Sequence, residues 1–266
     1  MVGKVFLPTQ RVLDFPITAL RFEDQIQTIL KWGMSRQSKT VCVANVHMLM
    51  EAHWNPEFAN RLQNSDIVTP DGMPLVWMMR HMGVRCQDRV AGMDIFLEVC
   101  QHAQTHNISV FFVGSKKEIL DKIHTKLKQE FPKLKIAGME PLPFCPLREI
   151  EDKPLINEIN SSGAGIVWVS LGCPKQEKWM IKHKGKIQAV MVGVGGVFPV
   201  YAGIQKRAPR LVRDLGLEWF YRWMQEPRRL WRRYTTTIPA FIWLATRQLL
   251  SNRNSISGVF IHTTGD

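Results

Sequence analysis

The residues best suited to chemistry follow short, β-branched runs of apolar residues. Asp71 comes directly after the run DIVTP, in TPDGMP, and Asn45 lies near the end of TVCVANV. Arg89 and Asp94 flank a glycine in RVAGMD. A carboxylate at the end of a strand can act as a general base, an arginine can grip a phosphate, and an asparagine amide can bind a sugar hydroxyl. We therefore take Asp71 as a candidate base and the other three as candidates for substrate binding.

Each of these residues also has an ordinary structural interpretation. Asp71 can cap the helix predicted after it, in which Pro74 suits the first turn. Asn45 can simply form a turn, and Arg89 can be a solvated surface side chain. The sequence leaves these alternatives open.

Three glycine-containing turns offer backbone N–H groups to an anion. The first, in FFVGSKKEIL, precedes a predicted helix whose N-terminus would attract phosphate. The second, in SLGCPKQEKWM, crowds polar side chains into a first helical turn, and the third is GVGGVF. These turns add the following candidates for substrate binding: Gly114, Gly172, Lys175, Gln176, Glu177 and Gly195.

Several motifs of other enzyme classes are absent. No two aspartates lie two positions apart, so the DxD site by which many sugar transferases hold a metal is missing. His102 and His106 lack the glutamate of an HExxH zinc site. The sequence has no P-loop, no GxSxG elbow and no GxGxxG fingerprint. We expect neither a metal ion nor another cofactor.

The elements that must position these residues alternate between strands and helices. Strands are predicted at 40–46, 66–70, 108–114, 134–139, 165–172 and 188–196. Helices are predicted near 47–62, 73–82, 93–106, 116–130, 149–161 and 174–184. This pattern indicates an α/β domain, with a Rossmann-like parallel sheet covered by helices. Ligands of such sheets bind beyond the carboxyl ends of the strands, where the candidates lie.

The composition changes after about residue 200. Strand-like runs stop, and the segment LEWFYRWMQEPRRLWRRY at 217–234 interleaves aromatics with arginines. Between Tyr201 and Tyr234 nine basic residues face three acidic ones, which accounts for half of the net charge of +12. We therefore divide the chain into a catalytic domain at 1–200 and a basic helical appendage at 201–266.

The composition also indicates a compartment. The five cysteines are widely spaced and form no CxxC pair, which fits a reducing cytoplasm rather than a disulfide framework. No apolar run approaches the roughly 20 residues that span a bilayer, and residues 238–250 are better suited to lie on a membrane. We expect a cytoplasmic protein, peripherally attached to the membrane, that can self-associate.

The motifs ANVH, TPDG, RVAGMD, FFVGSKKE, SLGCPKQEKW, GVGGVF with AGIQKRAP, and LEWFYRWMQEPRR occur in this order from about residue 40 to 234. Together they resemble the bacterial WecG/TagA/CpsF glycosyltransferase family. The resemblance implies an inverting, metal-independent transfer of a sugar from a UDP-sugar to a polyprenyl-diphosphate-linked acceptor, at the inner face of the membrane. Such reactions build exopolysaccharides and other cell-envelope polymers.

The resemblance also assigns roles to single residues. Asp71 matches the proposed catalytic base, and Asn45, Arg89 and Gln176 match polar residues of the active site. Three arginines match those of the appendage that are thought to reach the diphosphate: Arg222, Arg229 and Arg232. Val43 and Pro199 depart from the family pattern. The resemblance therefore does not identify the donor sugar, which we expect to be an N-acetylhexosamine, its uronic acid or glucose.

Three other functions compete with this interpretation. A nucleic-acid-binding protein would use the basic aromatic segment for phosphates and base stacking, but it would leave Asp71 and the glycine turns without a role. A nicotinamide-dependent oxidoreductase is disfavoured by the missing fingerprint. A non-catalytic scaffold at the membrane surface would tolerate replacement of Asp71.

Overall fold

The computed structural model describes residues 7–142 and 152–259. At its centre is a six-stranded sheet in the order β4-β3-β8-β7-β5-β6, in which all neighbouring strands are parallel. The strands are β3 (Lys39–Ala44), β4 (Ile67–Pro70), β5 (Val110–Gly114), β6 (Ile136–Glu140), β7 (Ile166–Ser170) and β8 (Val190–Gly193). The six predicted strands and the Rossmann-like α/β fold are confirmed.

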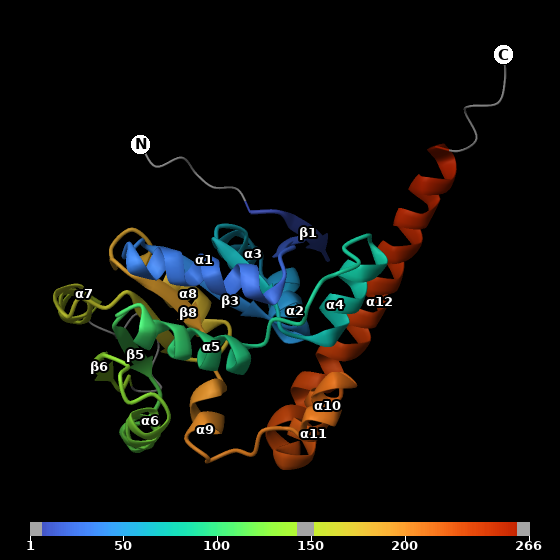
Figure 1. Ribbon diagram of the computed structural model, residues 1–266. Coiled ribbons are helices and arrows are strands. Elements are labelled where there is room, and N and C mark those ends of the chain that lie inside the picture. Colours follow the sequence, from blue (N-terminus) through green and yellow to red (C-terminus); the bar gives the residue numbers. More distant parts are fainter. Residues whose placement is uncertain (1–6, 143–151, 260–266) are drawn as a thin grey trace.

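Helices cover both faces of the sheet (Figure 1). The strands β5, β7 and β8 are therefore buried along their whole length. The helices that share one apolar core with the sheet are α1 (Phe22–Met34), α5 (Gly92–Thr105) and α6 (Lys117–Glu130). The helices that share the other are α2 (Val46–Trp54), α3 (Pro56–Gln63), α4 (Met73–His81), α7 (Asp152–Ser161) and α8 (Lys175–His183). The sheet is therefore doubly wound.

The chain leaves β5 and β7 in opposite directions, since β5 is followed by the outer strand β6 and β7 by the inner strand β8. Such a reversal opens a crevice at the carboxyl ends of the strands. Gly114 lies at this point with a φ of +98°, and a Cβ atom on it would lie 2.6 Å from the carbonyl oxygen of Ser170. The close approach of the two turns is a sufficient reason for glycine here.

The structure contains elements that the sequence analysis missed. An antiparallel hairpin of β1 (Thr9–Val12) and β2 (Phe15–Thr18) and the helix α1 precede the first predicted strand. The helix predicted at 47–62 is two helices, because Asn55 caps α3 with its side chain and Pro56 opens it. Of the helix predicted at 149–161, residues 149–151 lie outside the described part.

The cysteines in the described part of the chain are free thiols: Cys42, Cys86, Cys100 and Cys173. Cys145 lies outside it. The described cysteines therefore agree with the prediction that no disulfide framework holds this fold.

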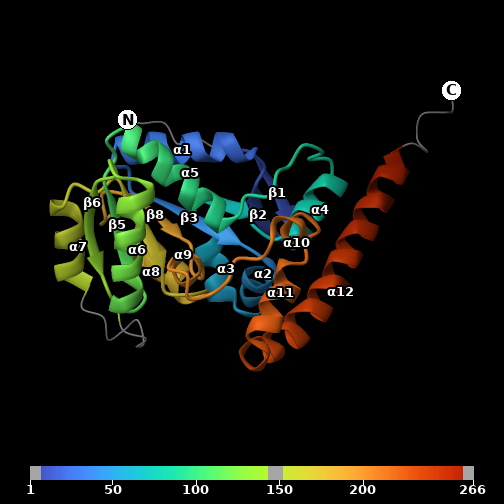
Figure 2. The same ribbon diagram turned by 60° about the horizontal axis from the view of Figure 1, so that its bottom comes forward.

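The C-terminal region is helical, as predicted. Its helices are α9 (Val197–Tyr201), α10 (Arg210–Asp214), α11 (Glu218–Gln225) and α12 (Pro227–Val259). The long helix α12 runs past α2 and α4 (Figure 2). It contributes Phe241 and Ala245 to the apolar core that α2, α3, α4, α7 and α8 share with the sheet. The division of the chain at residue 200 stays a prediction. Within the residues that the structure describes, no helix has the length and apolarity to cross a membrane.

Candidate active site

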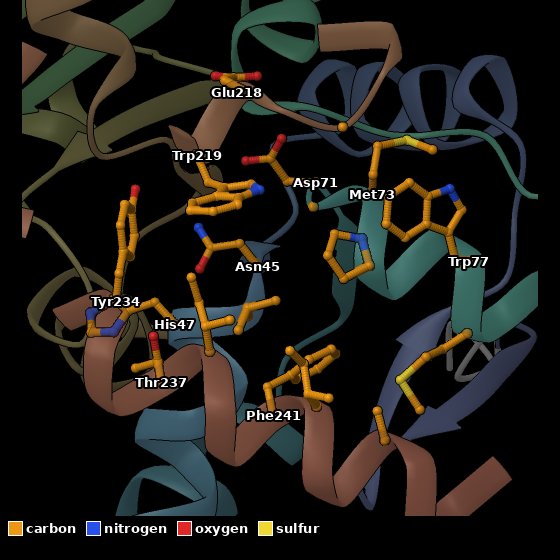
Figure 3. A pocket seen from close by; sticks show the side chains of 18 of the residues that line it. Asn45, His47, Asp71, Met73, Trp77, Glu218, Trp219, Tyr234, Thr237 and Phe241 are labelled. Carbon is orange, nitrogen blue, oxygen red and sulfur yellow. The ribbon is translucent and has the colours of Figure 1, made fainter. Parts of the chain in front are cut away.

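A cavity of about 550 Å³ lies where the carboxyl ends of β3 and β4 meet the C-terminal helices (Figure 3). Its walls come from the residues after these two strands, from α4, and from α11 and α12. The volume falls within the range of roughly 300–1,000 Å³ that is usual for small-molecule sites. The cavity is therefore large enough to hold a substrate between the two regions.

Asp71 is the first residue after β4 and faces this cavity (Figure 3). Its backbone N–H donates a hydrogen bond of 2.8 Å to the carbonyl oxygen of Ala44 at the end of β3. The N-cap of α4 is Gly72, and no side chain caps that helix. The capping interpretation of Asp71 is therefore wrong, and its carboxylate remains available for chemistry.

Arg89 holds Asp71 in two ways. Its Nε donates to the backbone carbonyl oxygen of Asp71 at 2.7 Å, and its Nη2 lies 3.3 Å from the Asp71 carboxylate. The same Nη2 donates to the carboxylate of Glu218, from α11, at 2.5 Å. One guanidinium thus joins a carboxylate of the sheet domain to a carboxylate of the C-terminal region, and Arg89 is no solvated surface residue.

The environment of Asp71 suits a base that works near neutral pH. Burial is the main cause that raises the pKa of its carboxyl group, the positive charges of Arg89 and Arg222 oppose it, and the negative charge of Glu218 adds to it, so that the net pKa is about 6. The side chain is a quarter exposed. Asp71 is ionised at pH 7 and yet basic enough to accept a proton from a substrate hydroxyl.

Asn45 serves the structure and faces the cavity. Its Oδ1 accepts a hydrogen bond of 3.1 Å from the backbone N–H of Met48, which caps α2. The cap fixes the side chain between Asp71 and His47 (Figure 3). Burial, helped by the charge of Arg233, lowers the pKa of His47 to about 4, so its imidazole is neutral at pH 7.

Three arginines from the C-terminal region line the cavity: Arg213, Arg222 and Arg233. Arg222 lies next to the turn that follows β8, where a Cβ atom on Gly196 would meet its Nη2 at 2.8 Å. Its charge also lowers the pKa of Asp71, which places it close to that carboxylate. Arg222 therefore connects the glycine turn after β8 with the candidate base.

The sequence analysis missed several residues of this cavity, among them Glu218, Arg213, Arg233 and Tyr234. All four belong to the basic C-terminal region, whose charge indicated an anionic partner but not which side chains turn inward. The available signal was Glu218 in LEWFYR, one of two glutamates within the basic segment at 217–234. An acid in such surroundings often marks an ion pair.

The glycine turns after β7 and β8 form a second polar locus. Gln176 is buried against them: Cβ atoms on Gly193 and Gly195 would lie 3.1 and 3.2 Å from its amide group. Its Nε2 donates to the carboxylate of the buried Glu177 at 2.7 Å, and its Oε1 has no hydrogen-bond partner in the described part of the chain. Burial raises the pKa of Glu177 to about 7.

Other predicted site residues lie outside the cavity. Arg207 and Arg213 pair with Asp94, which thereby ties α5 to the C-terminal region. Arg229 pairs with Glu226 on the outer surface, and Arg232 is exposed. Gly114 ends β5, Gly172 and Lys175 follow β7, and none of the three lines the cavity.

The described residues do not bring three histidine, cysteine or acidic side chains together in a way that would hold a metal ion. The cations around Asp71 are side chains instead. The cavity thus combines a carboxylate of raised pKa with arginines on its opposite wall, an arrangement that can accept a proton and neutralise an anionic leaving group.

Known proteins show the same sequence pattern. The sequence model of the WecG/TagA/CpsF glycosyl transferase family matches residues 10–255 of this chain. An N-acetylglucosaminyldiphosphoundecaprenol N-acetyl-beta-D-mannosaminyltransferase of Bacillus spizizenii is 35% identical over 203 residues, which cover 76% of either chain. A protein of the same name from Bacillus subtilis is 33% identical over 195 residues, which cover 73% of either chain.

Proposed function

This chain belongs to the WecG/TagA/CpsF glycosyl transferase family and is a glycosyltransferase, and we propose which transfer it performs. The sugar moves from a UDP-sugar to a saccharide linked to polyprenyl diphosphate, with inversion and without a metal ion. Because the family consists of glycosyltransferases, we do not pursue the alternatives of a nucleic-acid-binding protein, an oxidoreductase or a non-catalytic scaffold. The observation that carries the proposal is the Asp71 carboxylate, held by Arg89 in a cavity lined by arginines.

Asp71 is the base of the proposed reaction. The acceptor hydroxyl oxygen attacks the anomeric carbon of the donor sugar while the bond from that carbon to the diphosphate breaks on the opposite face. The hydroxyl proton passes to the Asp71 carboxylate, and UDP leaves. Arg89 orients Asp71 through its backbone and its side chain together, which keeps the carboxylate aimed into the cavity.

The leaving diphosphate belongs at the glycine turns, beside Arg222. The N-terminus of α8 lies at the turn after β7, and that of α6 lies at the neighbouring turn after β5; both offer N–H groups and a positive dipole end to an anion. Arg222 lies between Gly196 and Asp71 and can meet the charge that develops on the diphosphate. Arginine and backbone N–H groups thus take the part that a metal ion has in other sugar transferases.

The names of the two relatives support the acceptor class. Both proteins act on N-acetylglucosaminyl-diphospho-undecaprenol and transfer an N-acetylmannosaminyl group. We propose an acceptor of the same lipid-linked class for this chain. Its donor is a UDP-linked N-acetylhexosamine, the corresponding uronic acid, or glucose.

Contact with the membrane follows from where such an acceptor resides. The C-terminal region exposes several large apolar side chains, which suit the interface of a bilayer: Leu211, Leu215, Met224, Trp231, Trp243 and Leu250. Arginines lie among them and can meet anionic lipid headgroups. We propose peripheral attachment to the inner face of the cell membrane through α10, α11 and α12.

The test is release of UDP from a panel of UDP-sugars, with a polyprenyl-diphosphate-linked N-acetylglucosamine acceptor in detergent and a chelator present. We expect acceptor-dependent release from one donor, and a loss of at least about a hundredfold in Asp71→Asn, since a general base contributes that much. Asp121→Asn, an exposed aspartate on α6, is the matched control and keeps full turnover. Equal release by the wild type and Asp71→Asn would remove Asp71 from the mechanism.

A further inference from the structure

The cavity continues past the polar residues into an apolar arm between α4 and α12. Six residues define this arm: Met73, Trp77 and Met78 of α4, and Phe241, Ile242 and Ala245 of α12. On α4, Trp77 and Met78 follow Met73 by four and five residues, and on α12, Ala245 follows Phe241 by four, so each set forms a stripe on one broad face of its helix. The two stripes face each other across the cavity (Figure 3).

The chemistry of the wall changes along α12. Its first turns contribute Arg233, whose charge acts on His47, and Tyr234, whose ring packs against Trp219. Its later turns contribute Ile238, Phe241 and Leu249. At about 1.5 Å per residue, Arg233 and Leu249 lie roughly 24 Å apart along the helix. The cavity is therefore an elongated groove with a cationic end at the base and an apolar end away from it.

We propose that the apolar arm binds the first isoprene units of the lipid-linked acceptor, those next to its diphosphate. This inference rests on the proposed function, because it assigns a place to the lipid of that acceptor. A prenyl diphosphate has the same sequence of chemistry as the groove, an anionic head followed by a branched hydrocarbon. The arginines Arg213 and Arg233 complement the head, and the stripes of α4 and α12 complement the chain.

The far end of the arm is open, which a long lipid requires. Trp77 and Ile242 line the cavity and are 51% and 58% exposed. On the outer side of α12, Trp243 is 70% exposed and does not line the cavity. The rest of a long chain can thus leave the arm beside a surface that suits a bilayer. The donor is a poor occupant of the arm, because its nucleotide and sugar are polar.

The arm can be tested without turnover and without a membrane. The probe is farnesyl diphosphate, compared with inorganic diphosphate, and binding to the full chain is measured by isothermal titration below the micelle concentration of the prenyl compound. Burial of several methylene and methyl groups predicts that farnesyl diphosphate binds at least tenfold more tightly. Thr246→Trp fills the arm from an exposed position of α12, so it leaves the fold intact.

The matched control is Thr236→Trp, because Thr236 is an exposed threonine of the same helix that does not line the cavity. We expect Thr246→Trp to lose the preference for farnesyl diphosphate and Thr236→Trp to keep it. Equal affinity of the wild type for both probes, or equal behaviour of the two variants, would overturn the proposal. If the preference holds and no UDP-sugar is turned over, the prenyl arm stands and the proposed transfer fails.

Discussion

The two walls of the cavity differ in how the protein holds them. On the sheet side, Asp71 and Asn45 directly follow buried strands, and backbone or capping hydrogen bonds fix them. On the helix side, Glu218 and Arg222 belong to α11, a helix of eight residues without a buried side chain. The wall that carries the proposed base is therefore fixed by the sheet, whereas the wall that carries the cations depends on how α11 and α12 dock.

This difference suggests that the two walls have different roles in the proposed reaction. In the proposed mechanism the sheet preorganises the base, and the charges that act on it and on the leaving group belong to the C-terminal helices. Arg89 is the link, because one of its nitrogens contacts both Asp71 and Glu218. Docking of the helices thus completes the site, and variants on the two walls are expected to fail in different ways.

Removal of the whole helix side is expected to have the largest effect. Deletion of residues 201–266 removes Glu218 and the three cavity arginines, and turnover should fall by more than about a thousandfold. The sheet and most of its two cores remain, so the truncated chain should fold, with a lower melting temperature since Phe241 and Ala245 are lost.

Circular dichroism and UDP release measure these two outcomes. Deletion of residues 260–266 alone is the control and should leave turnover unchanged. A truncated protein with full turnover on a lipid-linked acceptor would show that the sheet side alone forms the site.

Loss of one cation on the helix side is expected to have a smaller effect. Arg222→Ala removes the guanidinium between the glycine turn and Asp71, and kcat should fall by roughly a hundredfold. Arg228→Ala, on an exposed position just beyond α11, is the control for a lost positive charge. Steady-state UDP release from both variants decides the matter, and equal losses would mean that only the overall charge counts.

The smallest expected effect is on stability and concerns the sheet side. Because the pKa of Asp71 is raised to about 6 in the folded chain, folding favours its protonated form. The folded state therefore loses stability as the pH rises from about 4 through 6, where the carboxylate ionises. Asp71→Asn should be more stable than the wild type at pH 7, by about 2–3 kcal/mol, and nearly equally stable at pH 4.

Urea unfolding of both proteins at the two pH values measures this difference. A lower stability of Asp71→Asn at pH 7 would mean that the ion pair with Arg89 outweighs the cost of burying the carboxylate.

The sheet side could be predicted from the sequence, and the helix side only in outline. Buried strands followed by polar residues indicate a site by local rules alone, which is why Asp71 and Asn45 were predicted to lie there. Arg89 lies between α4 and α5, and it was predicted from the motif RVAGMD instead. Glu218 and Arg233 reach the cavity only after two distant segments dock, and no local pattern reports that contact. Of the arginines carried over by resemblance, Arg222 lines the cavity, whereas Arg229 and Arg232 do not.

The missed hairpin has a local cause. Its turn consists of Leu13 and Asp14, both with positive φ, where Asn-Gly or Gly-containing pairs are usual. A leucine in that position gives no turn signal, so the alternation of the flanking strands was not recognised. The fold tolerates this turn since Leu13 is buried and its backbone N–H donates to the side chain of Gln248 on α12.

The pH dependence of kcat in the wild type and in Glu218→Gln tests the central claim most directly, which is that docking of the C-terminal helices tunes a base held by the sheet. We expect an acid limb near pH 6 in the wild type, which reports the ionisation of Asp71. Removal of the Glu218 charge should move this limb to lower pH, because that charge raises the pKa of Asp71. An identical limb in both proteins, or no limb in the wild type, would contradict the claim.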